Sequence, residues 1–154
     1  MINPEHDKIW LATARSYKRG ANVVWGYCSD NPDVSMLYLL PMLQLTAQSA
    51  ECYLKAWATI AGYSQKEIKD FGHNLTKIFG HCMQRKEIRI ADLHVILNKL
   101  DDDYKKNYFR YRPHIYIYPM SNFGKALETL ATLDSELDQI IKLDEQVVRY
   151  PGDS

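Results

Sequence analysis

The sequence predicts a single all-α domain, folded as an up-and-down bundle of four main helices with one or two short ones. Apolar residues recur at intervals of three and four along almost the whole chain, which is the period of an amphipathic helix. Short polar joints containing Pro, Gly and Asn interrupt this pattern, and no repeat or domain linker divides it. Because 154 residues, 46% of them hydrophobic, suffice for one core, we expect residues 1–154 to form one domain.

The first helix is expected to begin after Asn3, a favourable N-cap residue, with Pro4 in its first turn. Its inward stripe is expected to comprise Trp10, Ala14, Tyr17, Ala21, Val24 and Cys28. The Ser-Asp-Asn-Pro run at 29–32 should end this helix, because these residues favour turns.

The second helix is expected over residues 32–61, with a kink at Pro41, because the apolar pattern continues beyond that proline. Its apolar residues occupy two flanks and leave one narrow polar line, formed by Gln44, Gln48, Glu51 and Lys55. A helix with two apolar flanks must be covered on both sides. We therefore expect it to be the central helix, covered by the rest of the bundle, with a second subunit as a further candidate cover.

Two short elements should follow. Gly62 is expected to end the central helix, and Ser64 with Glu67 matches a capping box that opens a short helix. The run Gly72-His73-Asn74 interrupts the chain again, and Asn74 should cap the next helix. Because His73 directly precedes a capping residue, we expect it to be structural and to hydrogen-bond a neighbouring helix.

After a polar connection at 84–89, another helix and a last long helix are expected, separated by an extended or irregular segment at 110–121 that contains two prolines. The inward residues of the first of these helices should be Leu93, Leu97, Leu100, Tyr104 and Tyr108. Its opposite, polar face should carry His94, Asn98, Asp101 and Lys105. The last helix should be capped by Ser121 or Asn122. Its inward residues should be Ala126, Leu130, Leu133, Leu137, Ile140 and Val147.

Charge and cysteine content narrow the functional classes. The formal net charge is zero, so no global basic field attracts nucleic acid or an anionic membrane. The start of the chain does not have the pattern of a signal peptide, and the most apolar stretch, 34–45, is too short to span a bilayer. Three widely spaced cysteines, Cys28, Cys52 and Cys82, favour a reducing, cytoplasmic compartment over a disulfide framework or a zinc site. No phosphate-binding loop, Gly-x-Ser-x-Gly or Glu-x-x-His occurs, so we expect neither a cofactor nor a metal.

Arg89 and His94, separated by four residues, are the candidate catalytic pair. A histidine can move a proton from a ribose hydroxyl while an arginine stabilises the phosphorane charge, which together would cleave RNA without a metal. In the alternative, structural interpretation, Arg89 pairs with Asp92 one helical turn away and His94 lies on a solvated face.

The segment 104–118 interleaves cations with aromatic residues. Cations hold phosphates and aromatic faces stack bases, so this segment predicts contact with RNA or a nucleotide. The candidate contact residues are Lys105, Lys106, Tyr108, Arg110, Tyr111, Arg112 and Tyr116. Alternatively, this is a helix end whose tyrosines cover the core, with basic groups where the helix dipole favours them.

Four motifs follow one another in a fixed order. A hydrophobic run leads into Glu-Cys-Tyr-Leu-Lys-Ala at 51–56, then come Gly62 with a polar connection, Gly-His-Asn-Leu at 72–75, and Phe-Arg-Tyr-Arg at 109–112. Over residues 32–145 this order resembles the HEPN superfamily of small prokaryotic helical proteins, with its E-x-x-L-K-A, G-H-[DN]-L and aromatic-Arg-Tyr elements. The resemblance implies an all-α bundle, often dimeric, associated with RNA or nucleotides in defence or toxin–antitoxin systems.

The nuclease members of that family carry an arginine, usually followed by a polar residue, and a histidine after four to six residues. Arg89 and His94 have this spacing, but Ile90 occupies the second position. The other near match, Arg110 and His114, has only three intervening residues, one of them proline. We therefore expect a non-catalytic, homodimeric branch that binds RNA, a nucleotide or a partner protein. Two alternatives stay open: a metal-independent ribonuclease using one of these pairs, and a module that only binds proteins.

Overall fold

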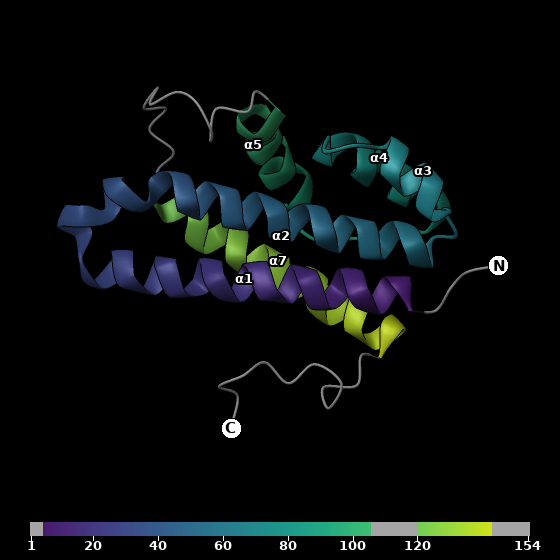
Figure 1. The fold of residues 1–154 in the computed structure, drawn as a ribbon, viewed down its shortest axis with the longest axis horizontal. Helices are drawn as coiled ribbons and strands as arrows, with labels where there is room; N and C mark the ends of the chain where they lie inside the picture. The colour runs from purple at the N-terminus through teal and green to yellow at the C-terminus, as the bar shows by residue number, and fades with distance from the viewer. Residues whose placement is uncertain (1–4, 106–119, 143–154) are drawn as a thin grey trace.

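The computed structural model describes residues 5–105 and 120–142, and within these ranges the chain is an all-α bundle without a strand (Figure 1). The fold class predicted from the sequence is confirmed. The elements are α1 (His6–Asp30), the 3₁₀ helix η1 (Pro32–Tyr38), α2 (Leu39–Ile60), α3 (Gln65–Asp70), α4 (Leu75–Arg85), α5 (Leu93–Lys105) and α7 (Met120–Ile141).

The three long helices α1, α2 and α7 lie along the long axis of the molecule, with α1 antiparallel to α2 and α7 (Figure 1). The shorter helices α3, α4 and α5 lie on the other side of α2 (Figure 1). Helix α2 contacts every other described element, and residues 51–59 are all buried. The prediction that this helix is central is therefore confirmed within a single chain.

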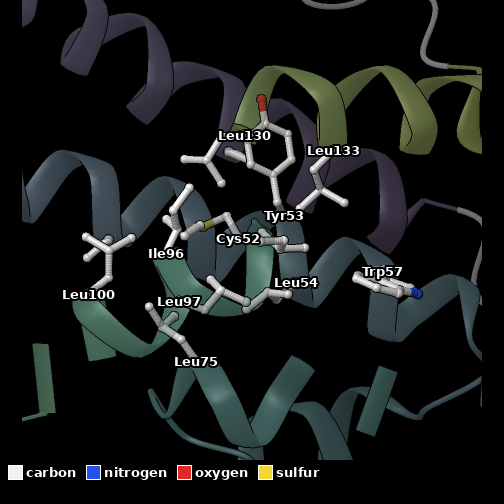
Figure 2. Packing of buried hydrophobic residues seen from close by; sticks show 14 of the residues in the cluster. Cys52, Tyr53, Leu54, Trp57, Leu75, Ile96, Leu97, Leu100, Leu130 and Leu133 are labelled. Atoms are coloured by element: carbon white, nitrogen blue, oxygen red, sulfur yellow. The ribbon is translucent and has the colours of Figure 1, made fainter. Parts of the chain in front are cut away.

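The core is built from opposite faces of α2. Tyr53 points toward Leu130 and Leu133 of α7, whereas Leu54 lies on the side of Leu75 and Leu97 (Figure 2). Because successive residues on a helix point about 100° apart, neighbouring side chains of α2 serve both halves of the bundle. This arrangement explains why the helix is apolar on two flanks.

The second helix differs from its prediction at its start. Residues 32–38 form the 3₁₀ helix η1, and the α-helix begins only at Leu39. Pro41 is therefore the third residue of α2, where the backbone N–H has no partner within the helix. The prediction of one continuous helix from Pro32 with Pro41 inside it is wrong, and a proline in the first turn removes no hydrogen bond.

The predicted joints between the helices are present. Gly62 has φ +93°, the left-handed conformation that ends a helix. Ser64 Oγ accepts a 3.2 Å hydrogen bond from the Glu67 N–H, and the Glu67 carboxylate accepts one of 2.7 Å from the Ser64 N–H, which completes the capping box. Asn74 Oδ1 accepts a 3.1 Å hydrogen bond from the Lys77 N–H and caps α4.

The inward stripe of α1 is largely as predicted. Ala14, Ala21 and Cys28 are buried. Trp10, Tyr17 and Val24 are partly buried against the core. The helix begins at His6, and the predicted start at Asn3 and Pro4 lies outside the described residues.

Helix α7 departs from its prediction at both ends. It begins at Met120, before the predicted caps. The predicted inward residues Ala126, Leu130, Leu133 and Leu137 are buried. Ile140, however, is 43% exposed and Ile141 is buried, because the stripe advances by four residues from Leu137 rather than three. Val147 lies outside the described residues.

Candidate functional site

An open hollow of about 370 Å³ lies between the end of α4 and the start of α5. Its lining is mostly apolar and comprises Phe79, Met83, Ile88, Arg89, Ile90, Ala91, Asp92, His94 and Val95. Val95 is 50% exposed, so the apolar surface is accessible from solvent. A concave apolar surface with a few polar groups is the usual form of a binding site.

Two contacts hold the loop that forms one wall of this hollow. Trp57 of α2 donates a 2.8 Å hydrogen bond from Nε1 to the backbone carbonyl of Lys86. Lys125 of α7 approaches Asp92 with a 3.3 Å ion pair. Asp92 has φ +65°, a conformation that Asp tolerates better than most residues, and α5 begins directly after it. The wall is therefore anchored to two of the three long helices, α2 and α7.

Arg89 and His94 both line the hollow. Arg89 lies in the loop before α5, at the end of the predicted polar connection, and its Nε donates a 2.7 Å hydrogen bond to Glu87. The side chain of Arg89 is 84% exposed. The alternative pairing of Arg89 with Asp92 is wrong, because Asp92 pairs with Lys125 instead.

The ring of His94 is exposed on the first turn of α5. Its centroid lies 5.9 Å from that of Phe79, and its Nε2 lies 3.5 Å from the side-chain nitrogen of Asn98. His94 is therefore next to an aromatic ring and an amide, and in the part of the chain that the structure describes no carboxylate hydrogen-bonds to its ring. The solvated position that the structural interpretation gave to His94 is the one observed.

A second polar cluster joins α2 to the turn between α3 and α4. His73 Nδ1 lies 3.0 and 3.1 Å from the two carboxylate oxygens of Glu51, and Lys55 Nζ donates a 2.6 Å hydrogen bond to the same carboxylate. The side chains of Glu51 and Lys55 are 5% and 10% exposed, whereas that of His73 is 75% exposed. The predicted hydrogen bond from His73 to a neighbouring helix is therefore present. Lys55 Nζ also lies 5.1 Å from the ring centroid of Trp10, a cation–π contact with α1.

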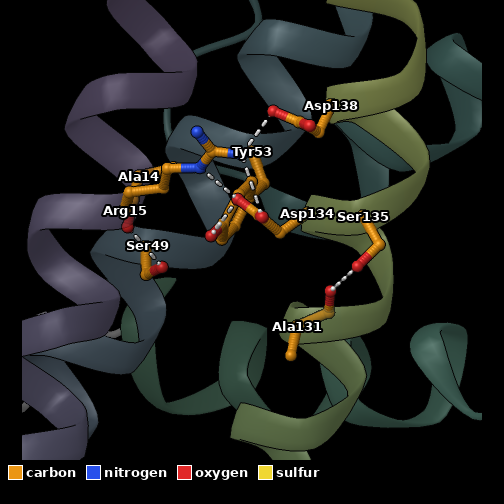
Figure 3. Close-up of polar contacts among 8 residues, drawn as sticks. All are labelled: Ala14, Arg15, Ser49, Tyr53, Ala131, Asp134, Ser135 and Asp138. Carbon is orange, nitrogen blue, oxygen red and sulfur yellow. Dashed lines mark hydrogen bonds and ion pairs between the residues drawn. The ribbon is translucent and has the colours of Figure 1, made fainter. Parts of the chain in front are cut away.

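A third cluster ties the three long helices together (Figure 3). Arg15 of α1 donates to Asp134 at 2.8 and 3.1 Å and to Asp138 at 2.7 Å, and Tyr53 of α2 donates to Asp134 at 2.9 Å. Burial lowers the pKa of Arg15, but its bonds to the two carboxylates outweigh burial and raise the pKa overall. Burial and the charge of Asp134 raise the pKa of Tyr53. Arg15 therefore stays charged and Tyr53 stays neutral near neutral pH, which suits a structural role.

Sequence reasoning missed the role of Asp101. It was expected on the polar face of its helix, yet it is only 2% exposed. Its carboxylate accepts hydrogen bonds from the Leu75 N–H at 2.9 Å and from the Thr76 hydroxyl at 2.7 Å. Asp101 therefore caps the N-terminus of α4 from another helix. No local signal reveals this contact, because the partners are 25 and 26 residues apart.

The three cysteines are free and buried. Burial raises the pKa of Cys52 and of Cys82 to about 12, so both remain thiols at neutral pH. Cys82 donates a 3.4 Å hydrogen bond from its sulfur to the carbonyl of Leu54. These cysteines are core residues rather than nucleophiles.

The basic–aromatic segment falls mainly outside the described residues. The candidates in that part are Lys106, Tyr108, Arg110, Tyr111, Arg112, His114 and Tyr116. Lys105 is the last residue of α5. Contact of this segment with RNA, and the alternative pair Arg110 and His114, therefore remain predictions.

Comparison of the chain with protein-family models, with curated proteins and with solved structures finds no match. Within residues 5–105 and 120–142, no group of three or more His, Cys, Asp or Glu residues is arranged to hold a metal ion. In the same ranges, no helix combines the length and the hydrophobicity needed to cross a bilayer. The HEPN resemblance remains a prediction.

Proposed function

We propose that this chain is a non-catalytic HEPN-like bundle that acts as a homodimer and binds a partner protein through the hollow between α4 and α5. The observation that carries the proposal is the apolar lining of this hollow, whose charged groups are already compensated. Arg89 is paired with Glu87, and Asp92 with Lys125. An apolar side chain of a partner gains free energy by burial there. A phosphodiester backbone would instead favour uncompensated cations.

The surroundings of Arg89 and His94 support a non-catalytic role. General acid–base catalysis needs a histidine placed and oriented for proton transfer, and phosphorane stabilisation needs an arginine aimed at the phosphate. Here His94 lies beside Phe79 and Asn98, and Arg89 is engaged by Glu87. If the HEPN resemblance reflects a toxin–antitoxin or other defence system, the bound partner would be the protein that this chain neutralises or that neutralises it.

The binding proposal is tested with Val95→Glu, which places a charge on the apolar wall of the hollow. The matched control is Ile9→Glu on α1, because Ile9 is exposed to a similar degree, 57% against 50%. Tagged wild-type and variant proteins are used to capture proteins from an extract of the source cells. We expect a partner that wild type and Ile9→Glu retain and Val95→Glu loses. Titration calorimetry with that purified partner should then show affinity reduced at least about tenfold by Val95→Glu. Equal binding by all three proteins would refute the proposal.

The ribonuclease alternative is supported by one observation, that Arg89 and His94 line the same hollow. End-labelled tRNA and total RNA are incubated with wild type, Arg89→Ala, His94→Ala and His114→Ala in the presence of EDTA. Cleavage that one variant loses would establish a metal-independent nuclease and replace our proposal. A salt-sensitive gel shift without cleavage would establish RNA binding instead. We expect neither.

A further inference from the structure

Gly26 occupies a position in α1 that no contact within residues 5–105 and 120–142 explains. It lies inside a 25-residue helix, where glycine is less favourable than alanine, and a Cβ atom at this position would meet nothing within 4 Å. Gly124 of α7 shows the opposite situation, because a Cβ there would lie 3.1 Å from the ring of Trp25. The glycine of α7 thus permits a close contact inside the bundle, whereas Gly26 leaves open space on an exposed helix face.

Asp30 is also at an unfavourable position, because it places a negative charge at the C-terminal end of a helix. It is the last residue of α1 and is exposed, and the last turn carries no basic residue. The negative end of the helix dipole disfavours a carboxylate at this place. Arg19, slightly more than three turns earlier, is exposed on the same side of α1. Gly26 and Asp30 each depart from a local helix preference without a compensating contact in the described part of the chain, and such residues are expected where a partner provides the gain.

Large apolar side chains surround Gly26. Val23 is 70% exposed and Tyr27 is 48% exposed. The ring of Tyr27 packs edge-on against Tyr38 of η1 at 5.2 Å, and Leu37, next to Tyr38 in the chain, is 76% exposed. The exposed apolar surface thus continues from α1 onto η1, at the end of the bundle where these two elements meet (Figure 1).

We define the α1 face as Arg19, Val23, Gly26, Tyr27 and Asp30, and we propose that it binds the α1 face of a second copy of this chain. The two α1 helices would be antiparallel, with a twofold axis passing between residues 24 and 25. Arg19 and Asp30 lie at equal distances along the helix on the two sides of that axis. Val23 and Gly26 also lie at equal distances on its two sides. Arg19 would therefore face Asp30 of the partner subunit, and Val23 would face Gly26 of the partner subunit.

Charge complementarity selects a second copy as the occupant. A surface with a cation at one end and a carboxylate at the other complements itself only when it is reversed, which is what a twofold axis does. The missing side chain at Gly26 provides room for Val23 of the partner subunit, so the helices approach closely. This inference rests on the homodimer part of the proposed function and names the surface that forms the dimer.

The test is a charge exchange measured by sedimentation equilibrium from about 1 μM to about 500 μM, a range suited to a small interface. Arg19→Glu and Asp30→Arg each place like charges opposite each other, twice per dimer. We expect each to raise the dissociation constant at least about tenfold. The double variant Arg19→Glu, Asp30→Arg restores the pairs in exchanged positions and should return the constant to within about threefold of wild type.

Gly26→Leu should also raise the dissociation constant at least about tenfold, because the larger side chain meets Val23 of the partner subunit. It should not lower the melting temperature of dilute protein, since leucine is the better helix former and meets open space. Ile9→Glu, outside the α1 face, should leave the constant unchanged.

The outcomes separate this inference from the proposed function. A dimer that tolerates both single charge variants and Gly26→Leu would overturn the α1 face and leave the homodimer intact. A wild-type chain that is monomeric throughout would overturn both the α1 face and the homodimer, and would leave binding at the hollow to be decided by Val95→Glu. Restoration by the double variant would show that the single variants fail by charge and not by misfolding.

Discussion

The hydroxyl of Tyr53 donates a 2.9 Å hydrogen bond to Asp134 and so joins the centre of the bundle to α7. Tyr53 is fully buried, and Asp134 also receives Arg15 from α1. Three helices thus meet at one carboxylate (Figure 3). Because a buried polar group is costly without a partner, each member of this cluster depends on the others.

We expect Tyr53→Phe to lower the free energy of unfolding by about 1 kcal/mol, because one hydrogen bond is lost and Asp134 keeps Arg15. Asp134→Ala should lower it by about 3 kcal/mol, because the buried Tyr53 hydroxyl loses its acceptor and Arg15 keeps only Asp138. Urea denaturation measures both values. Ser135→Ala, an exposed neighbour on α7, should stay within about 0.5 kcal/mol of wild type. Similar losses for Tyr53→Phe and Asp134→Ala would contradict this view of the cluster.

The buried pair of Glu51 and Lys55 predicts an asymmetric response to mutation. Glu51→Ala should destabilise the fold by about 3 kcal/mol, because it leaves the Lys55 ammonium buried without this carboxylate. The double variant Glu51→Leu, Lys55→Met should fall within about 2 kcal/mol of wild type, because it removes both charges and keeps the volume. His73→Ala should cost less than about 1 kcal/mol, since the side chain of His73 is 75% exposed. Chemical denaturation of the three variants checks this order, and a double variant less stable than Glu51→Ala would reverse it.

Asp101 should matter more to α4 than its own cap residue Asn74. Asp101→Ala is expected to cost about 3 kcal/mol, because it leaves the buried Leu75 N–H without its acceptor and leaves the Thr76 hydroxyl only its 3.0 Å bond to Asn74. Asn74→Ala should cost about 1 kcal/mol, the usual loss for a helix cap. Hydrogen exchange should show faster exchange at the start of α4 in both variants. If Asn74→Ala proved the more harmful of the two, the cap would be local after all.

The buried cysteines predict a loss of stability at alkaline pH. A cysteine in the unfolded chain has its ordinary pKa of 9.0, while burial raises the native pKa of Cys52 and Cys82 to about 12. Below pH 9 both states keep the protons and these thiols cause no pH dependence. As the pH rises from about 9 toward 12, only the unfolded chain loses them, so stability should fall by about 1 kcal/mol per pH unit for each thiol.

Urea denaturation at a series of pH values measures this slope, and Cys82→Ala should reduce it, since one of the thiols whose pKa is raised is removed. Wild type and Cys82→Ala are compared by the slope of stability against pH. Their stabilities at neutral pH are not compared, because Cys82→Ala also removes core contacts. The raised pKa of Tyr53 acts in the same direction from about pH 10, the ordinary pKa of a tyrosine, so the thiols are best separated from it below pH 10. An unchanged slope in Cys82→Ala would show that other groups cause the alkaline loss.

Local sequence signals predicted much of the fold because helices are made by local forces. The period of apolar residues, the capping box at Ser64 and the cap at Asn74 all act within a few residues. They were enough for the all-α class and the central position of α2. The start of α2 was misplaced because Pro41 suits a first turn as well as a kink, and the pattern of apolar residues does not separate the two.

The candidate site was only partly visible in the sequence. The spacing of Arg89 and His94 predicted a site in the segment that forms one side of the hollow. Phe79 and Met83 of the preceding helix α4 also line the hollow, and nothing in the spacing indicates them. Their contribution depends on how α4 packs against α5. The sequence also did not reveal which charges pair. Asp92 forms its ion pair with Lys125, 33 residues away in the chain, and not with the nearby Arg89.

The sequence by itself determined that the chain is helical, which residues cap its helices, and that one helix must be covered on two sides, because these properties follow from neighbours along the chain. Only the tertiary structure decided that Asp101 caps a distant helix, that Tyr53 and Arg15 share Asp134, and that Gly26 faces open space. These contacts depend on which helix surfaces meet when the helices pack. Packing brings together residues that are far apart in the chain, and no local sequence pattern indicates which of them will be in contact.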